Sequence, residues 1–218
     1  ERSRRSTGAS IAAAFSACSE GISANLAGGT HHSFADSGQG YCVFNDTCVA
    51  ARVLQDQELV KKVAFIDLDV HQGNGTSSIA VNDPMLFSFS MHCAENYPFK
   101  KTAGDLDVAL PPKCGDDEYL VRLKESLHLI FANFQPEFAF YLAGADPFEG
   151  DRLGRLSLSK SGLRQRDELV INYCRDSEIP IAICMAGGYA PDPNDIVDIH
   201  YATIKAASER YLKDRIGL

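Results

Sequence analysis

The stretch FIDLDVHQGNGT (residues 65–76) decides the fold class. It begins inside a short apolar run, residues 63–66, of the kind found in strands that are buried on both faces of a parallel sheet. Asp67, Asp69 and His71 follow at alternate positions, so in extended chain their side chains point to the same side. Parallel sheets bind ligands at the edge where their strands end. The stretch therefore predicts a parallel α/β domain with a ligand site after this strand.

Outward from this stretch, apolar runs of strand length alternate with segments of helical periodicity. Strands are expected over residues 22–26, 63–67, 86–91, 138–142 and 181–185, and helices over residues 3–20, 45–60, 116–134, 161–175 and 195–213. The stretch 96–114 contains three prolines and is expected to be a long loop. Strands that alternate with helices predict a three-layer αβα fold with a central parallel sheet. No linker divides the chain, so a single domain over residues 1–218 is expected.

Composition limits the class of protein further. The formal net charge of -8 argues against a surface that neutralises nucleic-acid phosphates or anionic lipid. The seven cysteines are odd in number and lack CxxC spacing, which indicates reduced thiols. The sequence contains no apolar run of membrane-span length and no signal-peptide core. We expect a protein of the cytoplasm, or of the nucleus or cytoplasm in a eukaryote, without a nucleic-acid or membrane partner.

A metal site is predicted from Asp69, His71 and Asp146. Asp146 follows the apolar run 138–142, so it is expected at the same sheet edge as the other two residues. Two carboxylates and one imidazole leave coordination positions open, as in a catalytic zinc site. The alternatives are a turn with solvated carboxylates for Asp69 and His71, and a helix-capping role for Asp146.

Two further features fall at expected strand ends. His31 and His32 are adjacent and follow a Gly-Gly pair, where they could serve as a general base and as its electrostatic partner or acid. Tyr189 also follows a Gly-Gly pair, and its hydroxyl could donate to a developing oxyanion. The alternatives are a metal-free loop with two partly exposed histidines, and an aromatic wall for Tyr189.

Five motifs together resemble those of histone deacetylases and their prokaryotic relatives. They are GGTHH (28–32), GYCVFND (40–46), FIDLDVHQGNGT (65–76), AGADPFEGDRLG (143–154) and AGGY (186–189). They occur in the family's order across nearly the whole chain, and QGNG and EGDRLGRLSLS resemble the class IV branch and the bacterial proteins grouped with it. The resemblance implies the arginase/deacetylase fold, with one zinc ion on Asp69, His71 and Asp146.

The resemblance also implies roles for individual residues. His32 matches the general base, His31 the histidine that pairs with Asp67, and Tyr189 the transition-state tyrosine. Gly40, Tyr41 and Tyr97 match the substrate channel. Asp67, Asp69, His71, Ser90 and Met91 match a site where many relatives hold potassium.

The sequence departs from the family pattern in two ways. Asn74 stands where many class I relatives carry an aspartate behind the second histidine, so His32 has a neutral partner and its pKa should be less elevated. Relatives also usually begin several tens of residues earlier. The resemblance therefore implies that an N-terminal strand and a rim loop lie outside this sequence.

The expected activity is hydrolysis of an N-acyl amide, with acyl-lysine in a protein as the leading substrate and acylated small amines as alternatives. An arginase-type ureohydrolase with two manganese ions would carry an aspartate two residues after the metal-binding histidine and a DxD pattern at the later strand end. Gly73 and Phe148 occupy those places, which favours one metal ion. A non-catalytic acyl-lysine binding protein would have lost a metal ligand or the tyrosine, and this chain retains them.

Overall fold

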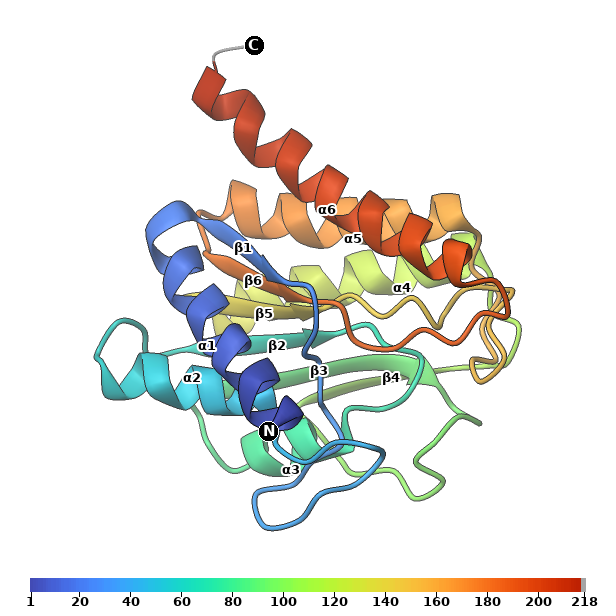
Figure 1. Ribbon diagram of the computed structural model, residues 1–218, viewed down its shortest axis with the longest axis horizontal. Coiled ribbons are helices and arrows are strands. Elements are labelled where there is room, and N and C mark those ends of the chain that lie inside the picture. The colour runs from blue at the N-terminus through green and yellow to red at the C-terminus, as the bar shows by residue number, and fades with distance from the viewer. Residues whose placement is uncertain (217–218) are drawn as a thin grey trace.

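The computed structural model describes residues 1–216, with side chains up to residue 211. Its core is one sheet of six parallel strands in the order β1-β6-β5-β2-β3-β4 (Figure 1). The strands are β1 (Ile22–Asn25), β2 (Val63–Asp67), β3 (Leu86–Cys93), β4 (Leu106–Leu110), β5 (Phe138–Leu142) and β6 (Ile181–Cys184). The helices are α1 (Arg2–Glu20), α2 (Asp46–Asp56), α3 (Asn74–Ala80), α4 (Asp116–Leu129) with a π-helical extension over Ile130–Phe134, α5 (Lys160–Asp176) and α6 (Pro193–Ile216).

Alternate residues of β2 pack into two separate cores. Val63 and Phe65 contact the apolar faces of α1 and α2, whereas Ala64 and Ile66 belong to the core beneath α4, α5 and α6. Figure 1 shows these last three helices together on one side of the sheet. Burying a side chain such as Phe65 contributes about 1.5–3 kcal/mol. Because both faces are covered, the continuous apolar run of β2 is explained and the predicted αβα fold is confirmed.

The strand order determines where a ligand can bind. β2 and β5 are neighbours at the centre of the sheet, but the chain leaves β2 towards β3 and leaves β5 in the opposite direction, towards β6. The loops after these two strands therefore diverge at the carboxyl edge of the sheet, which is where open α/β sheets bind ligands. The loops after β1 and β6 reach the same edge because all the strands are parallel.

Three local predictions differ from the structure. The expected loop 96–114 contains the edge strand β4, whose residues Val108 and Leu110 are buried while Asp107 is exposed. Helix α3 was not expected, because Gly, Ser and Thr are poor helix formers; it is tied to its surroundings by Thr76, whose N–H donates to the carbonyl of His31 at 3.1 Å. Helix α2 ends at Asp56 and not at residue 60, and Glu58 just beyond its end takes a left-handed conformation.

Among residues 1–216, no helix combines the length and the apolarity needed to cross a membrane.

Candidate metal centre

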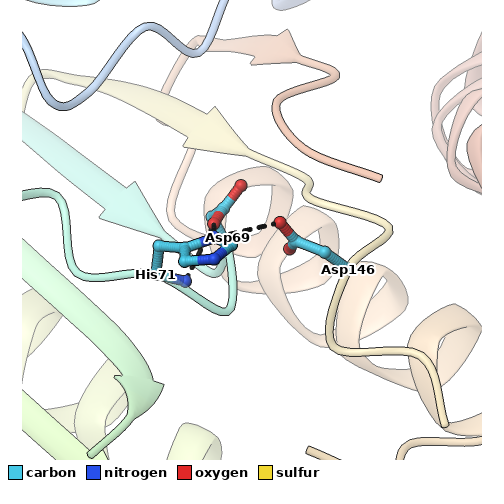
Figure 2. Close-up of side chains that lie close together, drawn as sticks. All are labelled: Asp69, His71 and Asp146. Atoms are coloured by element: carbon cyan, nitrogen blue, oxygen red, sulfur yellow. Dashed lines mark hydrogen bonds and ion pairs between the residues drawn. The ribbon is translucent and has the colours of Figure 1, made fainter. Parts of the chain in front are cut away.

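Asp69, His71 and Asp146 converge beyond the carboxyl ends of β2 and β5 (Figure 2). Each offers one ligand atom, and the three atoms lie within 4.8 Å of one another. The Nδ1 atom of His71 is 2.9 Å from Asp69 Oδ1 and 3.3 Å from Asp146 Oδ2. The turn after β2 produces this geometry, since the backbone N–H of His71 donates to Asp69 Oδ1 at 2.9 Å. The structure thus brings the three predicted ligands together.

Gly187 provides the space that the two carboxylates occupy. A Cβ atom at this position would lie 2.7 Å from Asp69 Oδ2 and still closer to Asp146 Oδ2, and no real Cβ makes contacts so short. The N–H of Gly187 donates to Asp69 Oδ2 at 3.0 Å. Asp146 is fully buried, and among the described residues its Oδ2 atom has no donor except His71 Nδ1, at a long 3.3 Å. A buried carboxylate oxygen that is so weakly paired is costly unless a cation binds it, so these residues fit a metal ion.

The charges of the site support the same conclusion. Burial and the charge of Asp69 raise the pKa of Asp146 to about 7. Burial lowers the pKa of His71, but its hydrogen bonds to Asp146 and Asp69 outweigh burial and raise this pKa to about 11. The two carboxylates therefore hold a proton on His71. A divalent ion would replace that proton and supply the positive charge.

The loop after β1 places His31 and His32 beside the three candidate ligands. Asp46 anchors this loop by accepting hydrogen bonds from the N–H groups of Gly29 at 3.2 Å and Thr30 at 2.7 Å. His31 Nδ1 lies 2.6 Å from Asp67 Oδ2. Both imidazoles are buried, and their ring centroids are 4.1 Å apart.

The tautomer of His32 follows from its neighbours. Asn74 Nδ2 donates to Gln39 Oε1 at 2.7 Å, so Asn74 Oδ1 faces His32 Nδ1 at 2.7 Å and accepts a hydrogen bond from its N–H. The Nε2 atom of His32 is then left with a free lone pair. Burial and the charge of His31 lower the pKa of His32 to about 3, whereas its hydrogen bond to Asn74 acts in the opposite direction.

The pKa of His31 moves in the opposite direction. Burial lowers it, but the charges of Asp67 and Asp69 outweigh burial and raise this pKa to about 9. Near neutral pH the pair therefore consists of one neutral and one charged imidazole. Two adjacent groups with separated pKa values are suited to opposite proton-transfer roles.

Tyr189 lies in the loop after β6, and both of its backbone polar groups are held by the loop after β5. Its N–H donates to Asp151 Oδ2 at 2.6 Å, and its carbonyl accepts from Arg152 Nε at 3.1 Å. Burial and the nearby charges of Asp69 and Asp146 raise the pKa of its hydroxyl. The hydroxyl is therefore protonated near neutral pH and can donate a hydrogen bond.

Two of the three expected channel residues contact His32. The ring of Tyr97 stands edge-on to the imidazole, with centroids 4.9 Å apart. Gly40 has a φ of +52°, and a Cβ there would lie 2.7 Å from His32 Cγ, so only glycine fits. Tyr41 has a φ of +64° and is 98% exposed, so its ring faces solvent rather than lining a wall among the described residues.

The residues expected at a potassium site lie next to the candidate ligands. Ser90 on β3 is in register with Asp67 on β2, and its Oγ atom accepts a hydrogen bond from the N–H of Gly73 at 3.3 Å. Met91 is the next residue of β3 and is fully buried. The two strands thus bring these residues together beneath the loop of His71.

Sequence reasoning missed the residues that hold the site loops. Asp46 follows a strong helix N-cap, Asn45, and the buried Asn-Asp pair was a signal that could have been used. Asp151 belongs to a motif used only for its resemblance. Arg166 and Asp167 lie in a helix so rich in charged residues that nothing in the sequence distinguished them from solvated ones.

The histone deacetylase domain model matches residues 1–203 of the chain. An uncharacterized protein of Picosynechococcus is 40% identical over 211 residues, which cover 97% of this chain and 70% of that protein. Histone deacetylase 2 of Arabidopsis thaliana is 37% identical over 189 residues, which cover 85% of this chain and 49% of that protein.

Among solved structures, acetylpolyamine aminohydrolase from Burkholderia pseudomallei superposes with a TM-score of 0.80 at 20% identity, covering 93% of this chain and 61% of that one. This likeness confirms the expected arginase/deacetylase fold. The chain thus spans about half to two thirds of the length of several proteins it matches. The histone deacetylase domain model covers residues 1–203, a range that includes the predicted metal ligands, the histidine pair and the tyrosine. By this match the chain belongs to the histone deacetylase family.

Proposed function

We propose that the chain is a zinc-dependent hydrolase that removes acetyl or other acyl groups from an amine, with acyl-lysine in a protein as the leading substrate. One observation carries the proposal. The buried Asp146 Oδ2, whose contact with His71 Nδ1 is a long 3.3 Å, converges with Asp69 and His71 directly beside a histidine pair whose pKa values are separated. This arrangement suits activation of a water molecule next to a polarised carbonyl.

The donor atoms of the candidate ligands favour zinc over other metal ions. Two carboxylates and an imidazole with open positions match catalytic zinc, and a bound zinc ion would polarise the acyl carbonyl and lower the pKa of water. We further propose potassium binding at Asp67 and Ser90 with neighbouring backbone oxygens, which are hard ligands suited to such an ion.

His32, His31 and Tyr189 have separate roles in the proposed hydrolysis. The neutral His32 accepts the proton of the attacking water at Nε2, since Nδ1 is engaged with Asn74. The charged His31, held by Asp67, faces the same region and favours the negative charge that develops there. Tyr189 donates its hydroxyl proton in a hydrogen bond to the carbonyl oxygen as the tetrahedral species forms. The proton on His32 then passes to the departing amine, so the base returns to its starting state.

The substrate is proposed from chemistry and from relatives. Two similar proteins, a histone deacetylase and an acetylpolyamine aminohydrolase, are named for action on acylated amines. The ring of Tyr97 stands edge-on to His32, and an aromatic surface beside the base suits the alkyl chain of an acyl-amine. Acylated small amines are therefore the second substrate class to test.

An arginase-type site with two manganese ions is disfavoured by one contact. A Cβ atom at position 73, where such a site carries an aspartate, would collide with Asp67 Oδ2 and would lie 3.3 Å from Asp67 Cγ. A second metal ion would therefore lack a ligand.

Metal content and acyl hydrolysis test the proposal together. Purified protein should bind about one zinc ion per chain and release acetate from an acetyl-lysine peptide or an acetylated diamine. Two manganese ions per chain with urea released from a guanidino substrate would instead support the ureohydrolase. A protein that binds acetyl-lysine peptide but never hydrolyses it with zinc bound would be a binding protein.

A further inference from the structure

Helix α5 buries a charged pair directly beneath the metal centre. Arg166 and Asp167 are wholly buried, although charged side chains are almost never found so deep in a protein. Removing both charges from water costs several kcal/mol per ion, and an apolar pair of similar volume would often give equal or greater stability. The position of this pair therefore calls for an explanation other than stability.

Asp167 compensates the charge of Arg166. Its Oδ1 atom lies 2.9 Å from Arg166 Nε and 2.8 Å from Arg166 Nη2. The same carboxylate accepts hydrogen bonds from the hydroxyl of Tyr141 on β5 and from Thr203 Oγ1 on α6, the latter at 2.6 Å. One edge of the guanidinium is thereby fixed against α5, α6 and β5.

The other edge of the guanidinium holds the two loops that carry the candidate metal ligands. Arg166 Nη1 donates to the carbonyl of Gly144 at 2.6 Å and lies 3.3 Å from the carbonyl of Leu68, to which it also donates. Leu68 directly precedes Asp69, and Gly144 stands two residues before Asp146. Both carbonyls lie just beyond the ends of β2 and β5, so one guanidinium bridges the two strand ends.

Gly144 also packs between the two candidate carboxylate ligands. A Cβ atom there would lie 2.9 Å from Asp146 Oδ1 and 2.9 Å from Asp69 Cα. A shift of the Gly144 backbone would therefore change the distance between Asp69 and Asp146. Functional metal sites hold ligand distances within about 0.2 Å, so small shifts of a ligand backbone weaken binding.

We infer that Arg166 is a positioning residue that sets the separation of Asp69 and Asp146 and thereby the affinity for the metal ion. It acts through the backbone carbonyls of Leu68 and Gly144 and touches neither ligand side chain nor substrate. The inference rests on the proposed metal site. Loss of an outer partner of a metal ligand typically lowers metal affinity about 10- to 100-fold, and we expect an effect of this size.

The test is the dissociation constant for zinc, measured by competition with a chromophoric chelator, so it needs no substrate. The variant Arg166→Met/Asp167→Asn removes both charges together and avoids leaving Asp167 as an unpaired buried ion. It should unfold cooperatively at a temperature near that of the wild type, yet bind zinc about 10- to 100-fold more weakly. A folded double variant with the zinc affinity of the wild type would overturn the inference.

Thr203→Val is the matched control. It removes a hydrogen bond to Asp167 but leaves both carbonyl contacts of Arg166, so its zinc affinity should stay within about twofold of wild type. An equal loss of affinity in this control would mean that any damage to the buried network weakens the site, and would also overturn the inference.

A second variant decides the question if the double variant does not fold. Arg166→Lys keeps the charge beside Asp167 but has a single nitrogen, which cannot take the place of Nη1 on the two carbonyls and of Nε and Nη2 on Asp167 at once. It should bind zinc about tenfold more weakly than the wild type, and an unchanged affinity would contradict a positioning role. Absence of zinc binding by the wild-type protein would instead remove the proposed metal site itself.

Discussion

Gly187→Ala should disable the metal centre by adding one methyl group. Gly187 has no left-handed φ, so the backbone accepts alanine and the effect comes from space alone. The new Cβ would lie 2.7 Å from Asp69 Oδ2, about 0.3 Å inside the 3.0 Å limit of real Cβ contacts, and it would overlap Asp146 Oδ2 more severely. Both carboxylates must move by more than the roughly 0.2 Å that metal–ligand distances tolerate.

We expect the zinc dissociation constant of this variant to rise at least about 100-fold, which corresponds to about 2.7 kcal/mol of binding free energy. Overpacking should also lower the free energy of unfolding by about 1–3 kcal/mol. Chelator competition gives the first quantity and denaturant unfolding the second. In wild-type protein, added zinc should raise Tm, because a ligand that binds only the folded state stabilises it. That shift should be small or absent in Gly187→Ala.

Gly188→Ala provides the matched control one residue away. Its Cβ would lie 3.1 Å from Ala145 Cβ and 3.1 Å from Ile196 Cγ2, so it meets apolar side chains instead of ligand oxygens. Gly188→Ala should be mildly destabilised but should bind zinc like the wild type. Retention of wild-type zinc affinity by Gly187→Ala would refute the assignment of Asp69 and Asp146 as ligands converging below Gly187.

Three further substitutions separate the proposed roles. Asp146→Asn should lose zinc and activity together, measured by metal analysis and acyl hydrolysis, because a neutral amide is a far poorer zinc ligand than a carboxylate; full zinc occupancy would exclude Asp146 as a ligand. Tyr189→Phe should keep its zinc but lose about 10²- to 10³-fold in kcat, the usual effect of removing one oxyanion donor; near wild-type kcat would leave Tyr189 as a packing residue. Asn74→Asp should raise the pKa of His32 from about 3. Because the base must be neutral, activity would then be lost at a higher pH on the acid side, and an unshifted acid limb of kcat/KM would argue against His32 as the base.

The order of elements was predictable because the strands of this fold are short apolar runs buried on both faces. The runs at β2 and β5 are fully buried, and such runs are typical of a parallel sheet that is covered on both faces. The edge strand β4 was missed because it is not such a run. Among the described strands it pairs only with β3, and it exposes alternate residues, so its composition resembles that of the surrounding loop.

The candidate ligands could be found because their chemistry is unusual where the fold places them. Asp69 and His71 alternate at a strand end, and adjacent histidines after paired glycines rarely serve packing. The separation of the His31 and His32 pKa values was not predictable in size or sign, because it depends on burial and on which carboxylate lies nearest. Asp67 and Asn74 are 36 and 42 residues away from their histidine partners, and only the folded chain brings them into contact.

The burial of Arg166 and Asp167 in α5 could not be predicted from the sequence. The α5 sequence KSGLRQRDELVINYCRD contains two arginines that differ in environment. Arg164 forms ion pairs with Glu168 and Glu209 at the surface, whereas Arg166 is wholly buried. Two residues advance the helix by about 200°, which separates a solvated face from the face that packs on the sheet. Helical periodicity would place an apolar residue at position 166. Arginine is explained at this position because the carbonyls beyond the ends of β2 and β5 lie where a long cation with several donors can reach them. By the inference above, this donor holds the two candidate carboxylate ligands at a fixed separation.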